Sequence, residues 1–342
     1  MRLRQAEELL LAAPRRVGLL AHLTPENFEA EVTRLTAQGD LGPPRFRYRP
    51  LPTEHDELAH ELDRAHARFR AEGDEVLQRR TEELSLELRL VRARGGPELR
   101  ELARLRYEDG VPMDEADAMA RGWLGEAPAL EIDLAARPVL SDDEGDPGSL
   151  VCRLRSVLGA ARLPVRVLVS EHLAPLAAAG DGFVQVAARR RITTVDVDRT
   201  VLHEIEAHVR PGLHARAAAD LLGIVGSARG SDTQEGYALL LERRAGFLGG
   251  DRARELAARH LAGRAAHEGA PFADAVGALV EAGASRAVAV RAACRAFRGG
   301  GLGREVAYLP AYLSVSRAPE AVIAVLARRR VSVSVAAEDL RG

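Results

Sequence analysis

Cysteine and membrane-length apolar runs are both scarce in this sequence. Its 342 residues include two cysteines, Cys152 and Cys294, which lie far apart and have no CxxC partner. This excludes a disulfide framework and a thiolate zinc site, so we expect both to be small core residues. No apolar run approaches the ~20 residues that span a bilayer, and arginines return soon after the first apolar residues. We therefore expect no membrane partner and a cytoplasmic protein.

The chain also has little net charge. Its 48 basic and 50 acidic residues are interleaved and give a formal charge of −2. No excess of one sign favours a nucleic acid, so we expect no nucleic-acid partner. With 46% hydrophobic residues, the chain can bury a sizeable core in one large domain or two ordinary ones. The sequence leaves the oligomeric state open.

The first part of the chain has the pattern of amphipathic helices. Apolar residues recur at three- and four-residue intervals up to about residue 130. The segment Pro43–Pro52 interrupts them, and its prolines predict an extended strap over the surface. We interpret the histidines of this part as surface side chains, not metal ligands: His55, His60 and His66.

An acidic segment rich in turn-forming residues, 141–149, has the composition of a linker. It separates a mainly helical region, residues 1–140, from a second region, residues 150–342. The boundary is soft, and the two regions are free to pack as one unit. In the second region, β-branched residues predict a strand at 165–170 and one or two strands within 183–197, with a short helix between them. Further helices follow, and VSVSV near the carboxy terminus predicts a brief strand.

The segment HEIEAH, His203 to His208, carries the strongest chemical signal. Two neutral imidazoles and one carboxylate hold zinc well and leave a fourth position for water. Glu204, beside the first histidine, would take the proton of that water and pass it to a leaving amine. Glu235 is the candidate third ligand on the next helix, with three rivals: His214, Asp232 and Glu242. We expect Glu206 to be solvated or to support the site indirectly.

The spacing of the two histidines makes a geometric demand. At 100° per residue, side chains five apart on a regular helix point roughly 140° apart, so they cannot share a metal ion. We expect Asp196 or Asp198 to cap this helix, and a π-bulge or an unwound turn around 207–209. Pro211 favours this distortion and is expected to end the helix together with Gly212.

Chance is a weak explanation of the motif. A chain with ten histidines and 50 acids would contain the His-acid-x-x-x-His spacing roughly 0.04 times. The alternative is structural, with His203 in the core and His208 as a capping or surface residue.

We also expect the strand before the motif to form the rim of a cleft, where an extended peptide pairs with its edge.

HEIEAH, followed after about thirty residues by TQEGYA, resembles the DUF1704 or QEGLA-motif family, which includes the microtubule-associated tyrosine carboxypeptidases. FRYRPLP, RAACRAFRGG and GREVAYL also resemble that family's pattern, from about residue 15 to about residue 325. The resemblance implies a zinc metallopeptidase in which His203, His208 and Glu235 bind Zn²⁺ and Glu204 is the base.

Two departures from the family pattern affect the expected substrate contacts. Tyr237 replaces the leucine of the QEGLA box, and its side chain either reaches the cleft or packs in the core. Gly303 to Glu305 replace a TKD-like sequence, so arginine stands where relatives carry lysine. A cation must hold the substrate carboxylate, and we name three candidates: Arg295, Arg298 and Arg304. Tyr308 matches the family tyrosine and is expected to donate to a carboxylate or oxyanion.

These observations predict an α+β protein in which a helical amino-terminal region packs beside a zincin-like catalytic region with a small sheet. The expected activity is that of a zinc carboxypeptidase that removes a terminal, aromatic residue from a peptide or protein tail. Two alternatives stay open. One is a metal-stabilised or metal-free binding and regulatory protein, and the other is a metal-dependent hydrolase of a non-peptide amide.

Overall fold

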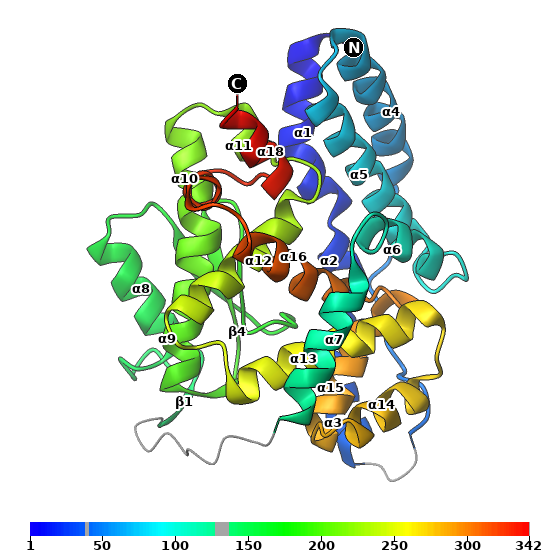
Figure 1. Ribbon diagram of the computed structural model, residues 1–342, viewed down its shortest axis with the longest axis vertical. Coiled ribbons are helices and arrows are strands. Elements are labelled where there is room, and N and C mark those ends of the chain that lie inside the picture. The colour runs from blue at the N-terminus through cyan, green and yellow to red at the C-terminus, as the bar shows by residue number, and fades with distance from the viewer. Residues whose placement is uncertain (38–40, 127–136, 342) are drawn as a thin grey trace.

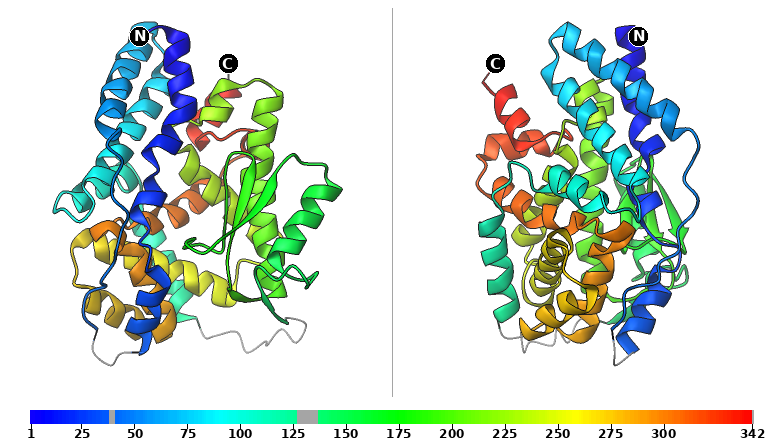
Figure 2. Two further views of the ribbon diagram at one scale, coloured as in Figure 1. Left: turned by 180° about the vertical axis from the view of Figure 1, so that it is seen from behind. Right: turned by 90° about the vertical axis from the view of Figure 1, so that its right-hand side faces the viewer.

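Helices make up most of the amino-terminal region. The computed structural model describes residues 1–37, 41–126 and 137–341. The first helices are α1 (Leu3–Val17), α2 (Leu19–Leu23), α3 (Phe28–Ala37), α4 (His55–Glu72), α5 (Glu75–Arg92), α6 (Leu99–Tyr107) and α7 (Met113–Gly125). α1, α4 and α5 stand together at one end of the molecule, as both views of Figure 2 show.

The strap predicted at Pro43–Pro52 is confirmed, because this segment contains no helix or strand. It is fastened at two aromatic residues. The ring of Phe46 stacks on Phe28 of α3 with 6.4 Å between centroids, and the Tyr48 hydroxyl accepts a hydrogen bond from the Gly299 amide at 2.7 Å. The strap therefore joins the amino-terminal helices to a segment 250 residues further along.

The interpretation of His55 as a surface side chain is wrong, because His55 is 4% exposed and its Nε2 lies within hydrogen-bond distance of the Arg16 carbonyl.

Two small sheets follow, made of β1 (Pro138–Leu140), β2 (Arg166–Ser170), β3 (Ala177–Ala179), β4 (Phe183–Ala187) and β5 (Arg191–Thr193), with α8 (Leu150–Ala160) between β1 and β2. β1 pairs with β5, and the second sheet has the order β2-β4-β3, parallel on one side and antiparallel on the other. The strands predicted at 165–170 and within 183–197 are confirmed. The short helix predicted between them is wrong, because 177–179 form β3. The strand expected at the cleft rim, β4, is central, and β3 lies beside the histidine motif.

The carboxy-terminal half is again helical: α9 (Thr194–Leu202), the π-helix η1 (His203–Val209), α10 (Arg210–Ala217), α11 (Leu221–Val225), α12 (Gly230–Arg244), α13 (Gly250–Glu268), α14 (Phe272–Glu281), α15 (Arg286–Ala296), the 3-10 turns η2 (Arg298–Gly300) and η3 (Arg304–Ala307), α16 (Tyr308–Ser316), α17 (Glu320–Leu326) and α18 (Val333–Asp339). The strand predicted for VSVSV is wrong, because Ser332 caps α18 there. α12 lies against α16 in the centre of the molecule (Figure 1).

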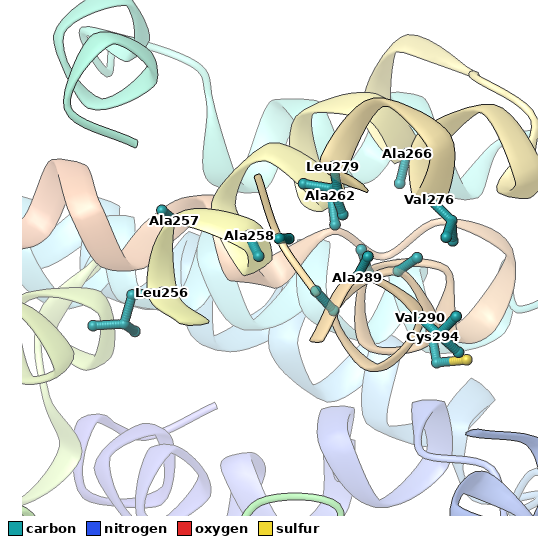
Figure 3. Packing of buried hydrophobic residues seen from close by; sticks show 14 of the residues in the cluster. Leu256, Ala257, Ala258, Ala262, Ala266, Val276, Leu279, Ala289, Val290 and Cys294 are labelled. Carbon is teal, nitrogen blue, oxygen red and sulfur yellow. The ribbon is translucent and has the colours of Figure 1, made fainter. Parts of the chain in front are cut away.

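The largest core cluster draws on both ends of the chain. Small side chains of α13 face α14 and α15, as Figure 3 shows for Ala258 and Ala262 of α13 and Ala289 of α15. α3 and α7 complete this cluster with Phe28 and Leu124 among others. The mixture of helices and small sheets confirms the α+β class. No helix in the described parts of the chain is long and apolar enough to cross a membrane.

The turn at 141–149 is more ordered than a free linker. Ser141 and Ser149 are both fully buried, and the Ser149 hydroxyl caps α8 by accepting from the Cys152 amide. Cys294 is a buried core residue as predicted, whereas Cys152 is only partly buried. The division into residues 1–140 and 150–342 stays a prediction.

Candidate metal centre

The two motif histidines lie on one helical path that changes type in its middle. α9 begins after Thr193, whose hydroxyl accepts from the Asp196 amide while the Asp196 carboxylate accepts from the Thr193 amide. The cap is therefore Thr193, and the expectation of Asp196 or Asp198 as the cap is wrong. The path continues as η1 from His203 to Val209 and as α10 to Ala217.

The π-helical turn solves the spacing problem of the two histidines. The Arg210 amide donates to the Ile205 carbonyl five residues earlier, which is the π-helical pattern. Residues five apart then lie on one face, and the rings of His203 and His208 have centroids 5.1 Å apart. The distortion predicted near 207–209 is confirmed. The predicted helix end is wrong, because Pro211 sits in the first turn of α10, where its missing N–H costs little.

Glu235 on α12 completes a cluster with both histidines. Its Oε2 lies 3.5 Å from His203 Nε2 and 4.0 Å from His208 Nε2. These three ligand atoms lie within 4.8 Å of one another. α12 begins at Gly230, so Glu235 lies in the second turn of the helix. The next residue, Gly236, lets α12 approach the backbone of α16 closely.

Glu242 contacts His203 through the ring nitrogen that does not face the cluster, and its oxygens are not among the three clustered ligand atoms. It lies seven residues after Glu235, on the same face of α12. Its Oε1 is 2.8 Å from His203 Nδ1, so Nε2 of this ring is left for a metal ion. Arg252 of α13 donates to both Glu242 oxygens at 2.9 and 3.0 Å. Glu242 was a rival third ligand, and the structure gives it this orienting position.

The other rivals point elsewhere. Asp232 forms a buried ion pair with Arg106 of α6 at 2.7 Å. The side chain of His214 is exposed, and its Nδ1 lies 3.4 Å from the carbonyl oxygen of Ala327. Glu206 pairs with Arg210 on the helix surface, as expected of a solvated side chain. Among the described residues, the cluster of His203, His208 and Glu235 is the group whose geometry suits a metal ion.

Glu204 lies between the helix and the sheet. Its Oε2 accepts a hydrogen bond from the Ala179 amide of β3 at 2.8 Å, and its residue is 5% exposed. Burial raises the pKa of Glu204 to about 7, the charge on His203 opposes this rise, and the charge on Glu235 adds to it. The carboxyl group is thus coupled to both neighbouring ligands. No side-chain pattern could identify Ala179, because it contributes a backbone amide.

The two histidines have different charge environments. Burial disfavours the charged form of His203, but hydrogen bonds with Glu235 and Glu242 outweigh it and raise its pKa to about 10. Burial lowers the pKa of His208 to about 4. The carboxylates of Glu235 and Glu242 therefore favour positive charge at His203, whereas burial disfavours it at His208. Arg330, which sequence reasoning missed, donates to the His208 carbonyl at 3.2 Å and fixes the end of the π-turn.

Of the three candidate arginines, Arg304 reaches the cluster. Its Nη2 is 3.2 Å from Glu235 Oε1, and its Nη1 donates to the Tyr308 hydroxyl at 2.9 Å. Arg295 and Arg298 turn to Glu305 instead, with contacts of 3.3 and 2.9 Å. Both are buried, so their guanidinium groups serve the core around η3. The predicted role of these two arginines at the substrate is therefore not supported by their contacts.

Tyr237, where the family pattern has leucine, is a packing residue. Its side chain is 6% exposed and belongs to a hydrophobic cluster with Val315 and Leu326. Of the two possibilities that the sequence left open, the structure shows the second. Glu235 therefore faces the two histidines, and Tyr237, two residues later on α12, packs into the hydrophobic cluster.

The donor set fits a zinc ion by chemistry and by spacing. Zinc ligands at about 2.0–2.2 Å in a tetrahedron stand roughly 3.3–3.6 Å from one another. The separation of 3.5 Å between His203 and Glu235 lies in this range, and the 4.0 Å separation to His208 is slightly wider. Two imidazoles and one carboxylate leave one position open, as in catalytic zinc sites. The carboxylate on His203 Nδ1 is the usual second contact of a zinc-binding histidine.

Comparison with protein families gives a match over most of the chain. A family model described as microtubule-associated tyrosine carboxypeptidase matches residues 34–331. The matched range includes η1, α12 and the segment from Arg304 to Tyr308. No curated protein and no solved structure matches the chain.

Proposed function

The chain belongs to the microtubule-associated tyrosine carboxypeptidase family, as its motifs predicted, and from that membership we propose that it is a zinc-dependent carboxypeptidase. The observation that carries the proposal is the cluster of His203, His208 and Glu235, with Glu204 beside it. We further propose that η1 and the edge strand β3 form a zincin-like site. The substrate is the carboxy-terminal tail of a peptide or protein, with tyrosine as the residue removed.

The metal ligands are His203 Nε2, His208 Nε2 and one oxygen of Glu235. A bound zinc ion supplies Lewis acidity, which lowers the pKa of water and polarises a carbonyl group. Glu242 keeps the His203 ring in the tautomer that leaves Nε2 unprotonated. Arg304 orients Glu235 by donating to its other oxygen.

Glu204 is the general base of the proposed reaction. Its carboxylate takes a proton from water as the oxygen attacks the scissile carbonyl carbon, and then gives that proton to the leaving nitrogen. The bond to the Ala179 amide holds Oε2 and leaves Oε1 for the water. The contact also places Glu204 beside the edge of β3, where an extended peptide backbone can pair.

Arg304 and Tyr308 form the proposed contact with the substrate. The Tyr308 oxygen accepts from Arg304 Nη1, so its own O–H is free to donate to a developing oxyanion. The Arg304 guanidinium is planar and suits a terminal carboxylate. Arg295 and Arg298 are left out of this role because their contacts are with Glu305 and not with the cluster of His203, His208 and Glu235.

The substitution Glu204→Gln tests the function. It keeps the shape and removes the base, so we expect zinc content to stay unchanged. Release of tyrosine from a peptide with a free carboxy terminus should fall by about 10²–10⁴-fold. Glu206→Gln, on the same helix but facing solvent, is the matched control and should keep full activity. Intact metal binding with unchanged hydrolysis in Glu204→Gln would exclude the assigned role of Glu204. A zinc-loaded parent chain that releases no tyrosine would instead favour a non-catalytic metal protein.

A further inference from the structure

A cavity of about 490 Å³ opens beside α9, α13 and α15, and neither the motifs nor the proposed reaction uses it. Its walls contain five arginines and three acidic residues. Leu124, Ala284, Val288 and Ala292 provide the apolar part of the lining. The chain contains no lysine, so the basic residues of this cavity are all arginines.

Two of the five arginines are neutralised by carboxylates. Arg291 makes a bidentate contact with Glu29, with both distances 2.9 Å. Arg252 binds both oxygens of Glu242 and also contacts Glu255 at 3.1 Å. These two residues form a fixed part of the wall, and little of their charge is left for another anion.

The other three arginines have fewer carboxylate contacts, and Asp251 also lines the cavity beside them. Arg259 shares Glu255 with Arg252, and Arg199 has one contact with Asp196 at 2.8 Å. Arg254 donates to main-chain carbonyls, including Leu124 O at 3.1 Å, and pairs with no carboxylate of a described residue. Burial and the neighbouring Arg252 lower the pKa of Arg199, and burial lowers that of Arg259 to about 10. Guanidinium groups are thus crowded at this cavity, and Arg254 is the one without an ion pair to a described carboxylate.

We propose that this cavity binds a small polyanion with carboxylate or phosphate groups, held by Arg199, Arg254 and Arg259. Guanidinium groups bind such anions through planar, paired hydrogen bonds. The apolar wall from α15 accommodates a short carbon skeleton. The anion site is separate from the proposed metal site, although Arg252 lies between them and contacts Glu242.

Calorimetry on the full chain tests the proposal without any measurement of turnover. Citrate and inorganic phosphate are titrated separately at low ionic strength, so that the two anion chemistries are distinguished. We expect at least one of them to bind with a stoichiometry of one, and added salt to weaken the binding. The double substitution Arg199→Gln and Arg254→Gln should weaken it at least tenfold. Arg64→Gln, on the exposed face of α4, removes one charge elsewhere and should leave it unchanged.

A second variant separates loss of the site from loss of the fold. Ala287 is exposed and lines the cavity, so Ala287→Glu places a carboxylate among the arginines. We expect this variant to bind neither citrate nor phosphate and to melt at a temperature no lower than the parent chain. The proposal is overturned if neither anion binds the parent chain, or if both variants bind as the parent does. Binding of an acidic peptide in the absence of binding by either small anion would overturn it in favour of a peptide subsite.

Discussion

At the residue scale, Glu242 shows how much of a metal site lies outside its ligands. It fixes His203 through Nδ1 and is itself held by Arg252. We predict that Glu242→Gln weakens zinc binding by about 10–100-fold, because the ring loses its carboxylate partner. Chelator competition measures the affinity, with circular dichroism to show that the chain stays folded.

Glu206→Gln is again the control for that measurement, because Glu206 lies on the same π-turn and pairs only with Arg210 on the surface. Its zinc affinity should equal that of the parent chain. Equal affinities in both variants would mean that Glu242 has a structural role and does not position the ligand.

Glu305 gives a prediction about stability and pH. It is 2% exposed between Arg295 and Arg298, and Glu305→Gln leaves two buried guanidinium groups without their carboxylate. We expect the free energy of unfolding at pH 7 to fall by about 3–5 kcal/mol. Urea denaturation of both proteins measures the difference.

The pH dependence of this difference follows from the direction of the shift. Burial alone would raise the pKa of Glu305, but the charges of Arg298 and Arg295 outweigh it and lower the pKa from 4.5 to about 2. A carboxylate whose pKa is lower in the folded state stabilises the fold at pH values above its unfolded-state pKa. This stabilisation is lost as the pH falls and the carboxylate becomes protonated. The gap between parent and variant should be constant above pH 5 and shrink between pH 4.5 and 2. A gap that persists unchanged at pH 2 would contradict this explanation.

The residues that could be predicted from sequence are those whose spacing carries chemistry. His203, Glu204 and His208 share one motif, and Glu235 stands in a second one. Arg252 and the Ala179 amide had no such signal, because they reach the site from α13 and β3 through tertiary packing. Arg298 was a candidate because of its charge, whereas its contact with Glu305 is revealed only by the fold.

At the element scale, α12 carries Glu235 and depends on a close approach to α16. A Cβ atom on Gly236 would lie 2.4 Å from the carbonyl carbon of Ala311 and 2.8 Å from the Tyr312 nitrogen. Both are main-chain atoms, so the helices would have to separate. We predict that Gly236→Ala lowers the free energy of unfolding by about 1–3 kcal/mol or more and weakens zinc binding.

The control is Gly277→Ala in the middle of α14, where an added Cβ has no neighbour within 4 Å. This change should be neutral or should stabilise the fold by about 0.5–1 kcal/mol, because alanine is the better helix former. Thermal and urea unfolding of the two variants measure both effects. A Gly236→Ala protein as stable as the Gly277→Ala protein would rule out the close contact as a constraint.

Element type could be predicted well where the pattern was long and poorly where it was short. The π-turn was expected because a regular helix cannot bring the rings of two histidines five residues apart onto one face. Pro211 also disfavours a regular α-helix at this point of the chain. Ala177–Ala179 has helical composition but pairs with β4, so tertiary contacts override its propensity. VSVSV has the alternation of a strand, yet the Ser332 cap and Ala336 in the core make it the start of α18.

At the scale of the whole molecule, the helical amino-terminal region and the metal-binding region share a core. Phe28, Val32 and Leu35 of α3 belong to the same buried cluster as α13 and α15. Further contacts cross between the regions, such as the hydrogen bond between Glu108 and His267 Nδ1 at 2.7 Å and the ion pair of Arg106 with Asp232. Composition indicated a boundary near residues 141–149, but it carries no information on which surfaces meet after the chain returns.

This shared core predicts that the chain unfolds in one cooperative transition. Leu35→Ala removes a fully buried side chain from α3 and should lower the free energy of unfolding by about 2–5 kcal/mol. The free energy of opening measured by hydrogen exchange at the amides of α13 and α15 should fall by the same amount. These amides lie more than 200 residues away in the sequence. Leu105→Ala, at a side chain that is 49% exposed, is the control and should change neither quantity appreciably. Two separate calorimetric transitions, with the Leu35→Ala effect confined to the first 140 residues, would instead establish two independent domains.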